Sequence, residues 1–176
     1  MLFSWMRGTV SLEVQAAQRA CADLRSLEDF FLDPTPENLQ GLATQAVSLP
    51  QDPFLLGLES LRACARKTAQ EAALFKAETG LFLPIARLLR ESGERLARCA
   101  AASRRERALG LEQAALARKG FGRVEALCRQ GEKTLLESER VVHRLKNREV
   151  FRRLSELAAY GTRAAESLAQ RMAGER

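Results

Sequence analysis

The sequence predicts an all-α fold, an antiparallel bundle of five to six helices, and three observations support this prediction. Apolar residues recur at alternating steps of three and four, which places them on one face of a helix. Alanine, leucine, glutamate and arginine dominate the composition, and only 6% of the residues are aromatic, a usage typical of helices. No segment alternates apolar and polar residues over a useful length, as a half-buried strand would.

The chain of 176 residues is long enough for one domain with a core of its own. A globule of this size buries about 70% of the surface that its unfolded chain exposes. We assign residues 10–176 to a single helical-bundle domain and residues 1–9 to an apolar N-terminal flap. The flap contains Leu2, Phe3 and Trp5, which either pack on the bundle or dock on a membrane or a partner protein. Its apolar run is too short for a signal peptide or a membrane span.

The first helix is predicted to run from about Val10 to Phe31, before the break at Asp33 and Pro34. Its buried face is predicted to hold Val10, Val14, Ala17, Cys21, Leu24 and Phe31. Thr35 is then a suitable N-cap, and Pro36 fits the first helical position, where its missing N–H is not needed. These two residues predict a short second helix that ends near Ser48.

The third helix is predicted to begin with Asp52 as its N-cap and Pro53 in its first turn, and to end near Thr79 and Gly80. Its buried face is predicted to hold Leu58, Leu61, Ala65, Thr68, Ala72 and Phe75. Pro84 then predicts the start of a fourth helix. The inward residues of that helix are predicted to be Ile85, Leu88, Leu89, Leu96 and Cys99.

Residues 100–119 have a helical pattern but few large apolar residues, so they form either the middle of one long helix or a turn between two. The strongest predicted break is Gly120-Phe121-Gly122. A regular apolar face follows, at Val124, Cys128, Gly131, Leu135, Ser138, Val142 and Leu145. Asn147 permits a kink or a cap before the last helix. The face of that helix is predicted to hold Phe151, Leu154, Ala158, Gly161, Ala165, Leu168 and Met172.

The formal net charge of +6, from 28 basic and 22 acidic residues, favours acidic partners: nucleic acid, an anionic membrane surface or an acidic protein face. The candidate binding surface is a basic stripe of six residues: Arg140, Arg144, Lys146, Arg148, Arg152 and Arg153. Nucleic-acid binding would need stacking or groove-reading residues beside this stripe. Only Phe151 and Tyr160 are near, and Phe151 belongs to the buried face, so the pattern disfavours nucleic acid.

No catalytic or metal site is predicted. His143, the single histidine, is expected to be partly exposed and to pair with Glu139 one turn earlier. The residue three before it is Arg140, so the Glu-x-x-His pattern of di-iron bundles is missing. The acidic residues Glu28, Asp29, Glu132, Glu137 and Glu139 all have basic neighbours, which indicates surface ion pairs. Four widely spaced cysteines, Cys21, Cys64, Cys99 and Cys128, are interpreted as small buried residues in a reducing compartment.

The segment KNREVFRRLSELAAYGTRAAESLAQRM resembles the C-terminal helix of PhoU-like proteins, specifically the short phosphate-transport accessory proteins associated with Pit-type transporters. The matching features are Lys146, Glu149, Val150, Phe151, Leu154, Glu156 and a small-residue helix that ends in Leu168. The first helix, LEVQAAQRACADLRSLEDFF, and the following PENLQGLATQA are similar to the start of that family. The resemblance covers about half of the chain and implies a PhoU-like bundle.

The resemblance also implies a difference. PhoU-like proteins carry two carboxylates four residues apart on a helix, which serve as metal ligands, and the corresponding positions here are Ala159 and Arg163, with Thr162 between them. On the preceding helix only Glu132 could replace such a ligand. Because an arginine would repel a cation, we expect a protein without metal or cofactor.

We therefore expect a non-enzymatic cytoplasmic regulator, peripheral at the inner face of the membrane, that contacts a phosphate transporter or another protein partner. Two alternatives remain open: a helical adaptor or assembly subunit unrelated to phosphate, and a basic nucleic-acid-binding protein. The sequence leaves homo-oligomerisation open.

Overall fold

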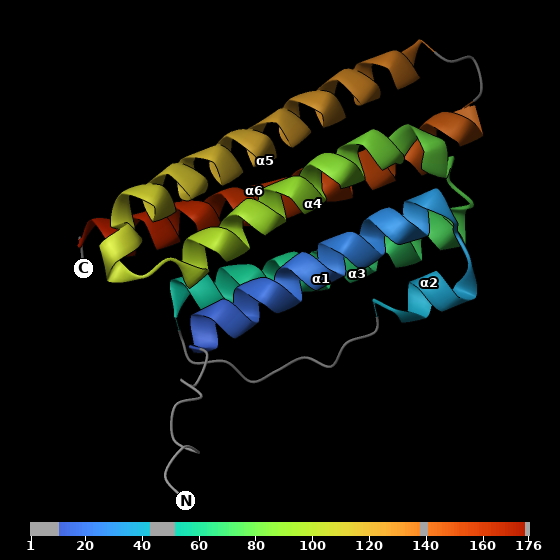
Figure 1. Cartoon of the computed structure of the whole chain (residues 1–176). Coiled ribbons are helices and arrows are strands. Elements are labelled where there is room, and N and C mark those ends of the chain that lie inside the picture. Colours follow the sequence, from blue (N-terminus) through green and yellow to red (C-terminus); the bar gives the residue numbers. More distant parts are fainter. Residues whose placement is uncertain (1–10, 43–51, 138–140, 175–176) are drawn as a thin grey trace, which may run out of the picture.

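The computed structural model describes residues 11–42, 52–137 and 141–174, and its helices carry the labels of Figure 1. Within these ranges the chain forms six α-helices, one 3-10 helix and no strand, which confirms the all-α prediction. The elements are α1 (Leu12–Leu32), α2 (Pro36–Gln40), α3 (Pro53–Phe75), α4 (Thr79–Ala101), η1 (Arg104–Glu106), α5 (Arg107–Leu136) and α6 (Val141–Ala173).

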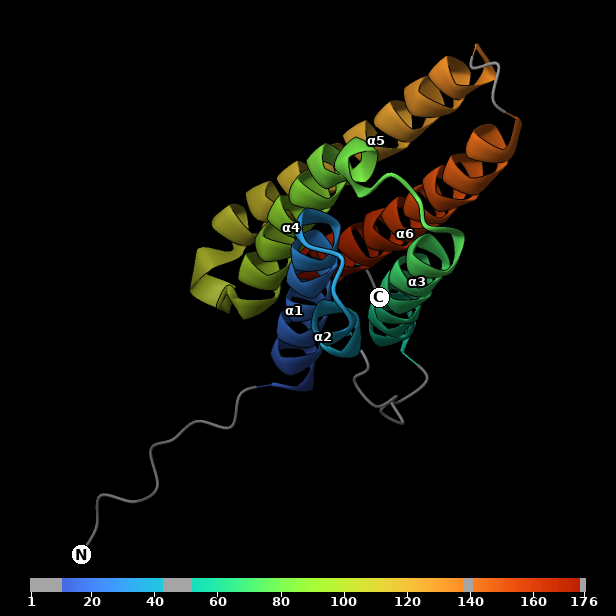
Figure 2. The same cartoon turned by 90° about the vertical axis from the view of Figure 1, so that its right-hand side faces the viewer.

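The five long helices form a closed ring in which α1 contacts α4, α4 contacts α5, α5 contacts α6, α6 contacts α3 and α3 contacts α1 (Figures 1 and 2). A ring with an odd number of helices cannot alternate direction throughout. One neighbouring pair therefore runs parallel, and Figure 1 shows that this pair is α1 and α3. The predicted antiparallel arrangement holds for the other neighbours.

The buried face predicted for the last helix is confirmed. Phe151, Leu154, Ala158, Gly161, Ala165 and Leu168 are buried in α6, and Met172 is partly buried against the core. The faces predicted for α1 and α3 are also largely confirmed, since Ala17, Leu24 and Phe31 are buried in α1 and Leu58, Ala65 and Ala72 in α3. Periodicity alone therefore identified most of the core.

Small residues let the helices approach closely. A Cβ atom added to Gly161 in α6 would lie 2.5 Å from the ring of Phe121 in α5. A Cβ atom on Gly120 would lie 2.1 Å from Oγ of Ser92 in α4. Contacts this short leave no room for a side chain, so the packing of α5 between α4 and α6 requires glycine at both positions.

The predicted boundary between the third and fourth helices is wrong. Helix α3 ends at Phe75, and Lys76 closes it in the left-handed conformation, with φ of 49°. Thr79 and Gly80 belong to the start of α4, and Pro84 lies inside that helix. A proline in the second turn removes the hydrogen bond to the carbonyl of Gly80, which is exposed and accessible to water, so the helix continues.

The predicted break at Gly120-Phe121-Gly122 is also wrong, because α5 continues through it. The break lies earlier, at Ala102 and Ser103, so residues 100–122 contain a turn between two helices. Oε2 of Glu106 accepts hydrogen bonds from the backbone N–H of Ser103 at 3.1 Å and from its hydroxyl at 2.9 Å. The sequence signal for this boundary was the Ser-x-x-Glu spacing of a capping box.

The apolar face predicted to continue to Leu145 ends sooner. Helix α5 ends at Leu136, and Ser138 lies outside the described residues. Val142 and Leu145 belong to α6 and are exposed to 65% and 62%. They are therefore on the surface, not in the core as predicted.

A buried ion pair joins the two parallel helices. Nε of Arg62 in α3 donates to Oδ2 of Asp23 in α1 at 2.8 Å, and Nη1 of Arg62 donates to Oε2 of Glu59 at 2.9 Å. Both Arg62 and Asp23 are buried. Helical periodicity does not predict this pair, because its members lie in separate helices.

Candidate functional site

The basic stripe lies on the first half of α6 wherever the structure describes it. Arg144, Lys146, Arg148, Arg152 and Arg153 all belong to this helix, whereas Arg140 lies outside the described residues. The flap residues Leu2, Phe3 and Trp5 also lie outside them. Local environment divides the five described cations into two groups.

Arg152 and Arg153 are engaged by carboxylates. Arg153 donates to both carboxylate oxygens of Glu71 in α3, at 2.8 and 2.9 Å, and to Glu156 at 2.9 Å. Arg152 pairs with Glu149 and Glu156, and its hydrogen bonds lower the pKa of Glu149. Arg153 therefore holds α6 against α3, whereas Arg152 neutralises two acids of its own helix.

The other three cations have no carboxylate partner among the described residues; Arg148 is exposed, and Arg144 and Lys146 are half-buried. Nη1 of Arg144 lies 3.4 Å from the carbonyl oxygen of Leu136, across the α5–α6 connection. Among the described residues, Lys146 and Arg148 have neither an ion-pair nor a hydrogen-bond partner for their side chains. Their charges are available to a binding partner.

His143 lies beside Glu78 of the α3–α4 turn, with 3.2 Å between its Nδ1 and Oε1 of Glu78. The predicted partner, Glu139, lies outside the described residues. Asn147 is buried under this contact, and its Oδ1 accepts a hydrogen bond from the backbone N–H of Glu78 at 3.2 Å. Asn147 therefore neither kinks nor caps a helix, but ties α6 to the start of α4. Its position on the apolar face, three residues before Val150, was the available signal.

The small cavity beside His143, of about 210 Å³, has no hydroxyl or thiol in its lining. It is lined by Lys76, Glu78, Val142, His143, Lys146 and Asn147. A histidine base would need a hydroxyl or thiol within reach. The four cysteines are buried elsewhere, and burial raises the pKa of Cys64 and Cys99 to about 11 and that of Cys128 to about 12. Such thiols stay protonated and unreactive.

The positions equivalent to the PhoU-like ligands lie near a cavity of about 320 Å³ between α5 and α6. Its lining includes the carboxylates of Glu125, Glu132 and Glu156, but also the guanidinium groups of Arg129 and Arg152. Within the part of the chain that the structure describes, no three His, Cys, Asp or Glu side chains are grouped closely enough to hold a metal ion. Glu132, the one acid expected to replace a family ligand, therefore shares this lining with two other acids and two arginines.

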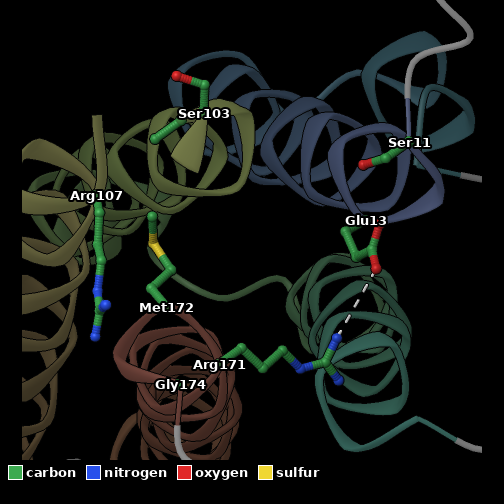
Figure 3. Close-up of a pocket in the computed structure, with 8 residues that line it drawn as sticks. Ser11, Glu13, Ser103, Arg107, Arg171, Met172 and Gly174 are labelled. Carbon is green, nitrogen blue, oxygen red and sulfur yellow. Dashed lines mark ion pairs between the residues drawn. The ribbon is translucent and has the colours of Figure 1, made fainter. Parts of the chain in front are cut away.

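A cavity of about 850 Å³ lies where the start of α1, the α4–α5 turn and the end of α6 meet, and Figure 3 shows its lining. Its two arginines point in different directions: Arg171 pairs with Glu13 and Asp52, and Arg107 donates to the carbonyl oxygen of Ala173. No charged groups converge on its centre. An apolar groove of about 320 Å³ runs between α4, α5 and α6, lined by Leu81, Pro84, Ile85, Leu127, Leu135 and Phe151, among others.

Aromatic residues do not extend the basic stripe into a nucleic-acid surface. Phe151 is buried in the core, where its ring meets that of Phe82 edge to face with 4.9 Å between centroids. Tyr160 is partly buried and lies under the guanidinium of Arg163, 4.8 Å from its ring centroid. Neither ring is presented beside Lys146 and Arg148.

No described helix combines the length and the hydropathy that a passage through a lipid bilayer requires. Comparison of the chain with protein-family models and with curated proteins finds no match. The PhoU-like resemblance therefore stays a prediction.

Proposed function

We propose that the protein is a non-enzymatic accessory protein that docks through Arg144, Lys146 and Arg148 of α6 on the acidic surface of a partner. Following the resemblance to PhoU-like proteins, the partner we propose is an inorganic phosphate transporter at the cytoplasmic face of a membrane. The chain would act without a metal or another cofactor.

The distribution of charge along the chain carries this proposal. Residues 102–173, which include α5 and α6, hold 16 basic and 9 acidic residues, whereas residues 1–52 hold 3 basic and 7 acidic residues. The basic excess thus lies on one hairpin of the bundle, and Lys146 and Arg148 lie at one end of it. Such asymmetry steers a protein toward an acidic surface and orients it there.

Two further observations support a binding role. The four cysteine thiols are buried with raised pKa values, and the cavity beside the single histidine has no hydroxyl or thiol in its lining. At the family's ligand positions, Arg163 and the neighbouring Arg152 supply positive charge where a cation would need oxygen ligands.

The test is affinity capture from native membranes and cytosol with the full chain, a Lys146→Glu/Arg148→Glu variant and an Arg19→Glu/Arg25→Glu control on α1. The variant and the control change net charge equally. We expect the wild type and the control to recover a phosphate transporter, and the α6 variant to lose it.

Protein, nucleic acid and metal are measured on the same samples. Recovery of nucleic acid with an affinity that falls steeply with salt would replace the proposal by the nucleic-acid alternative. Stoichiometric metal would contradict action without a metal. A transporter recovered equally by all three proteins would show that the α6 cations do not form the docking surface.

A further inference from the structure

One end of the α5–α6 hairpin exposes a cluster of large apolar side chains. Leu136 at the end of α5 is 66% exposed, and Val141, Val142 and Leu145 in the first turns of α6 are 54%, 65% and 62% exposed. We call these four residues the apolar tip. Figure 2 shows that this end of the hairpin reaches past the ends of α1, α3 and α4. The four side chains are therefore exposed at an end of the hairpin that projects beyond the other helices.

The apolar tip is not a frayed edge of the core. At about 100° per residue, Val141, Val142 and Leu145 lie on the side of α6 opposite to Asn147, Val150 and Leu154, which are buried. The first turns of α6 therefore have a polar contact facing the bundle and apolar side chains facing away. Exposed apolar clusters of this kind indicate a surface that is covered in the functional state.

Cations follow the apolar residues at helical spacing. Arg144 comes three residues after Val141, Lys146 four after Val142 and Arg148 three after Leu145, so each lies about one turn further along the helix. Lys133 of α5 adds a fourth cation near this end, where two exposed acids, Glu137 and Glu78, oppose the positive charge. The apolar tip is thus followed by a collar of positive charge.

We propose that the apolar tip inserts into the interfacial layer of an anionic lipid bilayer. Leu136, Val141, Val142 and Leu145 would lie at the boundary between headgroups and acyl chains, and Arg144, Lys146 and Arg148 would contact the phosphates. Long basic side chains reach headgroups while their stems stay in the apolar layer. Apolar burial and attraction to anionic lipid together give the two signals that stable peripheral binding needs.

The projecting position and the charge favour a bilayer over a protein as the occupant. A partner helix would need a groove, and the groove between α4, α5 and α6 does not include Leu136, Val141, Val142 or Leu145 in its lining. A second copy of the chain would bring two collars of like charge together, which opposes association. The inference deepens the proposed function, because it supplies the surface that would hold the protein beside a membrane transporter.

The test is sedimentation of the full chain with protein-free vesicles, made of phosphatidylcholine alone or mixed with phosphatidylglycerol. We compare the wild type with Val142→Asn/Leu145→Gln. The matched control is Leu56→Gln/Leu109→Gln, which changes two leucines of similar exposure at the other end of the bundle. We expect binding to the anionic vesicles, weakened on the order of tenfold or more in the tip variant and unchanged in the control.

A third variant, in which Leu2, Phe3 and Trp5 are replaced by serine, separates the tip from the N-terminal flap. Binding that is lost only in this variant would overturn the proposal, as would wild-type protein that ignores anionic vesicles. Size-exclusion chromatography with light scattering completes the test: a dimer that dissociates in the tip variant would identify a second copy as the occupant. If the wild type does not bind vesicles but transporter capture still depends on Lys146 and Arg148, the lipid contact is rejected and the proposed docking on a transporter is kept.

Discussion

At the scale of single residues, glycine has two different roles in this bundle. Gly161 lies where α6 meets the ring of Phe121, so an added methyl group has no space. Gly122 lies in the middle of α5, where an added Cβ would have no neighbouring atom within 4 Å. The two positions are alike in sequence context, since both interrupt a helical pattern with a residue of low helix propensity.

We predict opposite effects for alanine at these positions. Gly161→Ala should lower the free energy of unfolding by about 1–3 kcal/mol, because the ring of Phe121 must shift in a packed core. Gly122→Ala should raise it by about 0.5–1 kcal/mol, because alanine loses less conformational entropy than glycine in a helix. Urea denaturation measures both. A destabilised Gly122→Ala variant would indicate that α5 is broken at this point after all.

The burial of the charged residues Arg62 and Asp23 cannot be predicted from the sequence around them. Each occurs in a helical segment with many charges, and nothing in the local pattern separates them from surface residues. They are buried because α1 and α3 run side by side in the same direction and bring the two side chains together across the interface. A buried charge requires such a partner.

At the scale of elements, helix ends depend on hydrogen bonds that the sequence only partly reveals. The N-caps of α1, α2 and α3 are Ser11, Thr35 and Asp52, and the side chain of each accepts a backbone N–H bond. The caps of α2 and α3 confirm the sequence predictions. The end of α3 was missed because it is closed by Lys76, where a glycine or asparagine is more usual.

The turn between α4 and α5 provides a test of the capping interaction. Replacing Ser103 by alanine should cost about 1 kcal/mol of stability, because the start of η1 and α5 loses its capping side chain. Ser103→Thr keeps the hydroxyl and should remain close to wild type. If residues 100–122 were one continuous helix, Ser103→Ala would stabilise the protein, since alanine has the highest helix propensity. Chemical denaturation of both variants distinguishes these outcomes.

At the scale of the whole molecule, ion pairs within and between helices link stability to pH. The hydrogen bonds of Arg152 hold the pKa of Glu149 below its usual value. Burial acts to raise the pKa of Glu94, but hydrogen bonds from Arg90 and Arg25 outweigh it, and the pKa is lowered. A carboxylate with a lowered pKa binds its proton less tightly in the folded state than in the unfolded chain, so acid favours unfolding.

We therefore predict that the contribution of Glu94 and Glu149 to stability is constant above the ordinary glutamate pKa of 4.5. This contribution declines as the pH falls below 4.5 toward the lowered pKa values of the two groups in the folded state. Urea denaturation at a series of pH values from about 7 down to about 3 would measure the slope. Glu149→Gln should be less stable at neutral pH and show a smaller decline. A wild-type curve that is flat over this range would contradict the prediction.

The sequence by itself determined the all-α class, a bundle of five to six helices and most of their buried faces, because a helix repeats every 3.6 residues and burial imposes that period on the chain. It also determined the cationic residues of α6. The tertiary structure decided which of those cations are engaged by carboxylates, because Glu71 comes from another helix. A closed ring of five helices must contain one parallel pair, and the tertiary structure decided that this pair is α1 and α3. It also decided that Val142 and Leu145 are exposed, because they lie in the first turns of α6 on the side opposite to its buried face. Helical periodicity alone does not show which face of a helix packs against a neighbour.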